Sequence, residues 1–259
     1  MKKCFGGNIK NILENYNIDY RIIKHMDKNI ILFVYPYKSF KETIIDAYYV
    51  ASYAGYKLAK EIVAELIAEG AEAEVGRDLP LQKLVIESGL AYIRRKNGLT
   101  YNREYGSRFY IGAVTVGAGN SLKTGQENHC LSATDFSLAA DQCPPKCNLC
   151  IKACPNDSIS DSGVSYDKCL RHLANDPKTM TAVQIKMLGG RVLGCDICQR
   201  VCPFNKSQYT EMPKELAEIC KDLSDADNIT KLTGIVGKNM VKNISAILSL
   251  SEKGEIYRS

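Results

Sequence analysis

Apolar and polar positions over the first 117 residues change repeatedly between strand-like and helical spacing. Residues 30–35 (IILFVY) are a wholly apolar run that ends at Pro36, which is typical of a buried strand. From about residue 41, apolar side chains recur every three or four positions until Gly70, where a helix would end. The pattern predicts strands at 30–35, 71–75 and 108–116, and helices at 41–69 and from Asp78-Leu79-Pro80 to Gly89. This alternation indicates an α/β layer domain over residues 1–120.

The rest of the chain has a different character. Residues 117–125 are rich in Gly, Ser and Asn, which places a domain boundary before residue 130. Residues 130–210 are rich in cysteine and turns and have little periodicity. Helical spacing returns over 214–223 and 228–250, the latter interrupted by Gly234 and Gly237, so we expect a helical C-terminal tail over 211–259.

Composition narrows the classes of protein. An apolar fraction of 45% in 259 residues is enough for a buried core, which excludes disorder as the main state. A net charge of +5 does not by itself indicate nucleic-acid binding. A membrane span needs about 20 apolar residues and a signal peptide about 7–15, and the sequence has neither. We therefore expect a cytoplasmic protein that does not bind membranes.

Cysteine is the most informative residue type. Eight of the 11 cysteines lie between Cys143 and Cys202, and a reducing compartment disfavours structural disulfides. One group reads C-x3-C-x2-C-x3-C-P from Cys143, and the other reads C-x2-C-x3-C-P from Cys195, with Cys169 upstream. In two-cluster ferredoxins the cysteine before proline ligates the other cluster, because a residue before proline is turned away from helical geometry.

The same crossing divides the eight cysteines into two complete ligand sets. The first set, which would hold one [4Fe–4S] cluster, is Cys143, Cys147, Cys150 and Cys202. The second set, which would hold the other cluster, is Cys154, Cys169, Cys195 and Cys198. Two four-thiolate zinc sites are the alternative. Cys4, Cys130 and Cys220 remain as incidental thiols. The predicted fold class is thus α+β: an α/β layer domain, a ferredoxin-like two-[4Fe–4S] domain over 130–210 and a short helical tail.

The cysteine-rich segment resembles a known family. Residues 194–205 (GCDICQRVCPFN) are similar to the GCDxCQxVCPxN signature of epoxyqueuosine reductases, and Lys168-Cys169-Leu170 fits the family's lone cysteine. Residues 237–240 (GKNM) look like its G-x-N-M segment, and the stretches at 79–81, 88–91, 97–98 and 105–107 look like the end of its catalytic domain.

This resemblance implies a cobalamin-dependent reductase that receives electrons through two [4Fe–4S] clusters from a donor of the ferredoxin or flavodoxin type. The family reduces epoxyqueuosine to queuosine in tRNA. It also implies that Gly89, Leu90, Ala91 and Asn97 contact the cofactor and that Asp78 is the catalytic proton donor. From the residues alone, Asp78 could equally be the N-cap of the helix that follows.

The departures from the family leave the substrate open. The family loop reads near GLGxxGxN, whereas this chain has Ala91 and Arg94 where glycine is expected. The segment 94–96 (RRK) would obstruct the cofactor, bind phosphate or corrinoid side groups, or form an exposed helix end. The family's N-terminal part is shortened and its C-terminal repeat is largely missing, which puts tRNA in doubt and leaves a corrinoid or small molecule as the substrate. A non-catalytic two-cluster electron carrier is the alternative function.

Overall fold

The computed structural model describes residues 4–5, 8–42, 44–93, 96–102, 104–117, 121–122, 143–144, 146–205 and 209–252. The chain folds as two compact units whose segments interleave. The sheet unit takes residues 1–37, 54–93 and 100–142, and the cysteine unit takes 38–53, 94–99 and 143–259. The contiguous division into 1–120, 130–210 and 211–259 stays a prediction, but the units show that a segment from the first third of the chain folds with the cysteines.

A four-stranded antiparallel sheet is the centre of the sheet unit. The strand order is β2-β3-β8-β5, and Ile31 of β3 lies opposite Val114 of β8. The strands are β2 (Asp19–His25), β3 (Lys28–Pro36), β5 (Ala73–Val75) and β8 (Phe109–Val116). The three strands predicted from the apolar pattern are confirmed.

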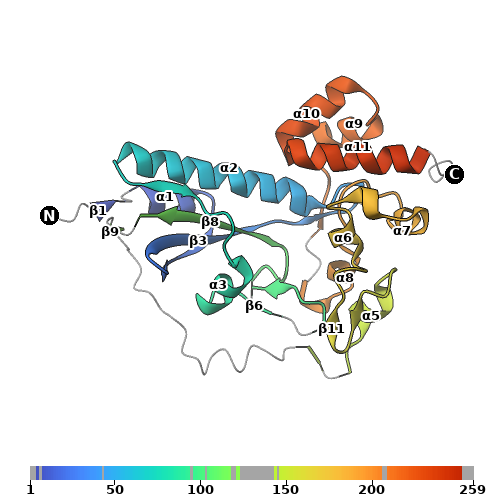
Figure 1. Cartoon of the computed structure of the whole chain (residues 1–259), viewed down its shortest axis with the longest axis horizontal. Helices are drawn as coiled ribbons and strands as arrows, with labels where there is room; N and C mark the ends of the chain where they lie inside the picture. The colour runs from blue at the N-terminus through green and yellow to red at the C-terminus, as the bar shows by residue number, and fades with distance from the viewer. Residues whose placement is uncertain are drawn as a thin grey trace. The chain divides into compact units, whose positions relative to one another are not determined.

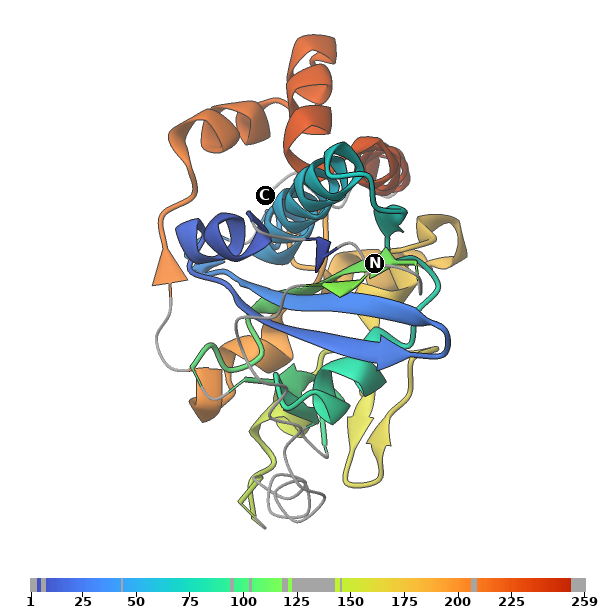
Figure 2. The ribbon, with the colours of Figure 1, turned by 90° about the vertical axis from the view of Figure 1, so that its left-hand side faces the viewer.

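Both faces of this sheet are covered, so β3 is apolar at every position of its middle. Ile31 and Phe33 face the core formed with α1 (Ile9–Asn15) and α2 (Ala47–Ala68). Ile30, Leu32 and Val34 face the core formed with α3 (Leu81–Glu87). Figures 1 and 2 show α1 and α2 on one side of the sheet and α3 on the other. Burying each such side chain stabilises the fold by about 1.5–3 kcal/mol.

The predicted helix at 41–69 begins later than its periodicity suggests. The described residues just before it instead make backbone contacts within the cysteine unit: Ser39 and Phe40 pair with Tyr209 and Thr210, and Ile45 bridges to Leu193. Because these partners are far along the chain, local spacing could not predict them. The sheet unit is completed by β1 (Cys4–Phe5), β6 (Tyr92–Ile93), β7 (Thr100–Tyr101) and β9 (Ser121–Leu122).

The cysteine unit consists of short elements. Its strands are β4 (Ser39–Phe40), β10 (Ile159–Ser160), β11 (Gly163–Val164) and β12 (Tyr209–Thr210). Its helical segments are α5 (Leu149–Ala153), α6 (Leu170–Leu173), η1 (Pro177–Thr179), α7 (Ala182–Met187), α8 (Ile197–Arg200), η2 (Pro203–Asn205), α9 (Lys214–Lys221), α10 (Ala226–Val236) and α11 (Lys238–Glu252).

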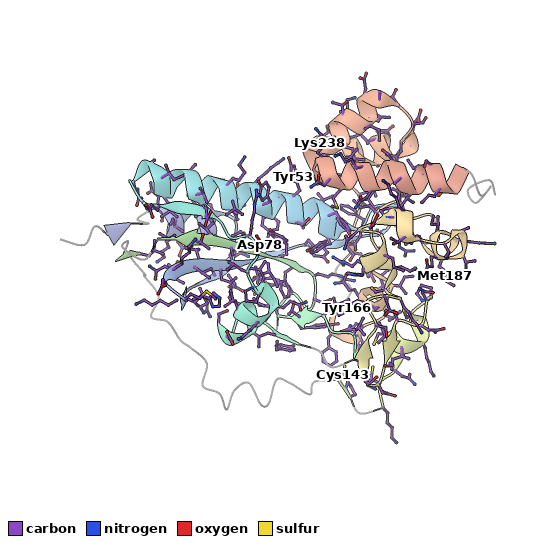
Figure 3. The ribbon with its side chains drawn as sticks, viewed as in Figure 1. Tyr53, Asp78, Cys143, Tyr166, Met187 and Lys238 are labelled. Carbon is purple, nitrogen blue, oxygen red and sulfur yellow. The ribbon has the colours of Figure 1, made fainter. Side chains whose placement is uncertain are left out.

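The helical tail packs on the rest of the cysteine unit. Ile247 of α11 is buried in a core with Leu170 and Ile185. Gly237, with φ of +86°, separates α10 from α11, and an added Cβ there would lie 3.1 Å from the Tyr53 ring. Tyr53 and Lys238 lie next to each other in Figure 3. Among the helices that the structure describes, none is both long and apolar enough to cross a membrane.

Candidate metal centre

The first cysteine loop turns tightly and then enters α5. The Cys147 N–H donates to the Pro144 carbonyl at 2.8 Å, and Cys150 is buried in the first turn of the helix. Cys154 ends the helix with φ −71° and ψ 114°, the extended conformation expected before Pro155. Its Sγ accepts a hydrogen bond from the Ser158 N–H at 3.3 Å. Figure 3 labels Cys143, the first cysteine of this loop.

The second cysteine loop repeats this design. Gly194, with φ of +84°, precedes Cys195, and Cys198 lies in α8, which contacts α5. Cys202 follows α8 and leads through Pro203 into η2. Asn205 is buried and its Nδ2 donates to the Gln199 carbonyl at 2.7 Å, which closes the loop. In each loop one cysteine precedes a short helix, one lies in the helix and one follows it. These are Cys147, Cys150 and Cys154 for α5, and Cys195, Cys198 and Cys202 for α8.

The first predicted ligand set shares one electrostatic environment. Burial raises the pKa of the Cys150 thiol, and negative charge on Cys143, Cys202 and Cys147 raises it further. Cys202 thus lies within reach of the loop at 143–150 although it belongs to the second motif. Burial disfavours a free thiolate, and coordination to iron removes the thiol proton.

Three members of the second predicted set also influence one another's thiol pKa. Burial is the largest effect that raises the pKa of the Cys198 thiol, and the charges of Cys195 and Cys169 raise it further. Burial likewise raises the pKa of Cys195 to about 11, and Cys169 acts in the same direction. Cys169 is 26 residues earlier, at the start of α6. Cys150 also raises the pKa of Cys198, so the two sets are neighbours.

Soft thiolates in this number suit iron–sulfur clusters or zinc. Within the described ranges, no three His, Cys, Asp or Glu side chains converge around one point as ligands of a single ion. The described cysteines from 143 onward are all free of disulfides. Burial raises the pKa of the Cys220 thiol to about 11, with the Glu42 charge acting in the same direction. Cys130 and the side chain of Cys4 lie outside the described residues.

Lys96 is the cation that accompanies the first cysteine loop. The Lys96 Nζ donates to the Cys147 carbonyl at 2.6 Å and lies 2.9 Å from an Asp161 carboxylate oxygen. The hydrogen bond to Asp161 raises the pKa of Lys96, and the thiols of Cys143 and Cys147 act in the same direction. Lys96 therefore lies beside the first set. Arg94 and Arg95, its neighbours in the predicted obstructing segment, lie outside the described residues.

The second set lies beside a buried network of charges that includes Arg171 and Arg200, two of the basic residues that the sequence offers for balancing cluster charge. Asp46 is buried; its Oδ2 lies 3.4 Å from Arg171 Nη1, and its Oδ1 accepts from the Tyr48 N–H at 3.0 Å. Asp196 is also buried, with one carboxylate oxygen 2.7 Å from Arg200 Nε and the other 3.8 Å from Arg191 Nε. The acidic residue of the GCD motif thus holds arginines next to the cysteines.

The predicted cofactor loop belongs mainly to the sheet unit. Gly89 turns the chain with φ of +74°, while Leu90 and Ala91 are buried in the core on the α3 side of the sheet. The Leu90 carbonyl accepts from Asn102 Nδ2 at 2.9 Å. Asn97 belongs to the cysteine unit, where it is buried and its Oδ1 accepts from the Leu99 N–H at 3.3 Å.

Asp78 lies on the loop between β5 and α3 and is exposed. It does not cap α3, because the N-cap position is Pro80 and no side chain bonds to the helix there. The N-cap alternative is therefore wrong. With φ of +55°, Asp78 adopts a left-handed conformation that is unfavourable for most residues. It lines a groove of about 720 Å³ together with residues of α2 and β5 (Figure 3).

Comparison with known proteins agrees with the cysteine pattern. Residues 142–205 match the family described as 4Fe-4S double cluster binding domain. The epoxyqueuosine reductase of Pseudomonas aeruginosa is 29% identical over 153 residues, which are 58% of this chain and 38% of that protein. The chain is thus similar to epoxyqueuosine reductases, and its residues 142–205 match a double [4Fe–4S] cluster domain. The aligned part is less than half the length of that curated relative.

Solved structures show the same likeness in fold. The epoxyqueuosine reductase of Bacillus subtilis has a TM-score of 0.53 at 16% identity, over 88% of this chain and 66% of the other. A crystal structure of epoxyqueuosine reductase with a modified tRNA stem loop has a TM-score of 0.55 at 17% identity and the same coverage. The predicted α+β class with a cluster domain is confirmed at this level.

Proposed function

We propose that this protein is a cobalamin-dependent reductase whose two [4Fe–4S] clusters receive electrons from a ferredoxin or flavodoxin. The observation that carries the redox part is that the negative charges of Cys143, Cys202 and Cys147 all act on the buried Cys150 thiol and raise its pKa. We assign that set to one cluster and Cys154, Cys169, Cys195 and Cys198 to the other. A cysteine from each motif then reaches into the opposite cluster, so the two clusters lie next to each other for electron transfer.

The turn at Gly89, with the adjoining Leu90 and Ala91, and the more distant Asn97 are the proposed cobalamin contacts. The turn fits such a ligand because its first residue has no side chain and the next two side chains point into the core. Backbone is then the part that can meet a flat ring closely. When bound, cobalamin supplies a low-potential cobalt centre as the source of an electron pair. The chain's own residues fix this turn through the hydrogen bond from Asn102 to Leu90.

We propose Asp78 as the residue that gives a proton to the leaving oxygen of the substrate. The Bacillus subtilis structure is described as having its catalytic aspartate loop swung out of the active site. Asp78 likewise lies on a loop, is exposed and lines a groove on the α2 side of the sheet, whereas Leu90 and Ala91 pack on the α3 side. Its use in catalysis would require that loop to move.

Asp78→Asn should abolish turnover while cobalamin affinity and cluster content stay unchanged. Asparagine keeps the size of the side chain and tolerates the left-handed backbone, but it cannot supply the proton. The measurement is reduction of epoxyqueuosine in a tRNA stem loop with a reduced flavodoxin. Glu87→Gln, at the exposed end of α3, is the control. Normal turnover of Asp78→Asn would exclude the proposed proton donor.

The proposed substrate is the epoxide of a modified tRNA base, since a related enzyme was crystallised with an epoxyqueuosine-modified tRNA stem loop. The reservation about tRNA that the sequence raised is not confirmed by these comparisons. The alternative function, a two-cluster electron carrier without cobalamin, is favoured by the separation of Asp78 from the Gly89 turn. Titration with cob(II)alamin, followed by its absorbance, distinguishes the two, because only the reductase should bind it stoichiometrically.

Anaerobic reconstitution should load about eight iron and eight sulfide ions per chain, as two cubanes require. Metal analysis and an assay for acid-labile sulfide measure this directly. Zinc bound in stoichiometric amount without sulfide would instead establish two structural zinc sites. That result would exclude both proposed redox functions.

A further inference from the structure

Arg171 is held next to the second ligand set by residues from a distant part of the chain. It lies two positions after Cys169, and its Nη1 is 3.4 Å from the Asp46 carboxylate. Its guanidinium carbon is 4.1 Å from the centre of the Tyr48 ring and 5.7 Å from that of Tyr49. A planar cation stacked on one ring and paired to a buried carboxylate has little freedom to move.

The position of Arg171 brings its charge close to the second set. Arg171 lies in α6, whose N-cap is Cys169, and its partner Asp46 packs against Gly194, the residue before Cys195, where an added Cβ would lie 2.8 Å from Asp46 Cβ. The Arg171 side chain is only 24% exposed, so water screens the interaction less than at the surface. Arginine stays protonated at any physiological pH, so this charge is permanent.

Resting on the ligand sets of the proposed function, we propose that Arg171 raises the reduction potential of the cluster held by Cys154, Cys169, Cys195 and Cys198. Reduction of a [4Fe–4S] cluster takes one electron from the donor flavodoxin or ferredoxin and no proton. The cluster gains a negative charge, and a fixed positive charge beside it stabilises the reduced form. Arg171 is therefore a tuning residue and not a ligand.

Lys96 provides the internal comparison, because it accompanies the other set. Its Nζ donates to the Cys147 carbonyl at 2.6 Å, within the first cysteine loop. The two cations should consequently act on different clusters. Lys178 is a matched control in the same unit, since it is an exposed residue of η1 whose charge is screened by water.

The test is a redox titration of the reconstituted full chain, in which EPR follows each cluster. The spectrum lost in Cys195→Ser identifies the second cluster. Arg171→Gln should reduce the equilibrium constant for reduction of that cluster about tenfold, or about 59 mV, and leave the other unchanged. Arg171→Lys should restore most of the potential. Lys96→Gln should lower only the first cluster's potential, and Lys178→Gln should change neither.

Two results would overturn this assignment: unchanged potentials in Arg171→Gln with both clusters fully loaded, or an equal shift of both clusters. If Arg171→Gln cannot hold the second cluster, Tyr48→Leu gives the same test, because it frees the guanidinium without removing charge. A smaller downward shift of the second cluster alone supports the proposal, and no shift refutes it. A wild-type chain that binds no iron–sulfur cluster would refute the proposed function itself, and this inference with it.

Discussion

Cys202→Ser is expected to abolish the cluster shared with Cys143, Cys147 and Cys150 and to leave the other cluster in place. Cys202 is four residues from Cys198 in sequence, but its charge acts on Cys150 of the first motif. Loss of one thiolate of four should leave about four iron ions per chain instead of about eight. Iron content and the EPR spectrum of the reduced protein measure the result.

The comparison variants make this result specific. Cys202→Ser should lose the same EPR species as Cys143→Ser and keep the one lost in Cys195→Ser. Cys220→Ser removes a half-buried thiol from α9, outside both proposed sets, and should keep both clusters. A Cys202→Ser spectrum that matches Cys195→Ser would show that each motif holds its own cluster, and the crossed arrangement would be refuted.

Gly194→Ala is expected to destabilise the cysteine unit by about 2–5 kcal/mol and to remove the second cluster first. The residue has φ of +84°, and an added Cβ would lie 2.6 Å from Tyr49 Cε2 and 2.8 Å from Asp46 Cβ. The backbone nearby is also fixed, since the Asp46 N–H donates to the Leu193 carbonyl at 2.9 Å. The Cys195 loop would have to move away from Asp46 and Tyr49.

Gly70→Ala is the matched control for this substitution. Gly70 has φ of +90°, but nothing lies within 4 Å of its added Cβ. This variant should therefore show only the backbone strain of about 1–2 kcal/mol. Urea unfolding, followed by the visible absorbance of the clusters and by circular dichroism, compares the two. Equal effects of the two substitutions would mean that the close approach to Asp46 and Tyr49 contributes nothing.

The sequence predicted those parts of the fold whose signals are local. The apolar run at 30–35 and the strand near 108–116 were found because they are buried on both faces. Gly237 separates two helices because it adopts a positive φ, whereas Gly234 is accommodated inside α10. Strand β2 was missed because its sequence, DYRIIKH, mixes charged and apolar residues without clean alternation.

The sequence was enough to predict the cysteines of the candidate site, but not the charged and aromatic side chains that surround them. Spacing and the Cys-Pro pairs are enough to propose which thiols belong together. Asp46 and Tyr48 carry no comparable signal, because Asp46 meets Arg171 across a sequence separation of 125 residues. Local sequence likewise gives no sign that Lys96 donates a hydrogen bond to the Cys147 carbonyl, 51 residues later.

The pairing of β4 with β12 has a consequence for the order in which this chain folds. Phe40 is synthesised early, yet its carbonyl accepts a hydrogen bond from Arg200, 160 residues later, and its strand pairs with Tyr209 and Thr210. All segments of the sheet unit end by residue 142, so this unit can fold first on the ribosome, before the cysteine-rich part is synthesised. Ser39 and Phe40 must then wait for their partners until Tyr209 and Thr210 have left the exit tunnel. Iron insertion into a nascent chain would thus be a late event, and contacts of such long separation make this step slow.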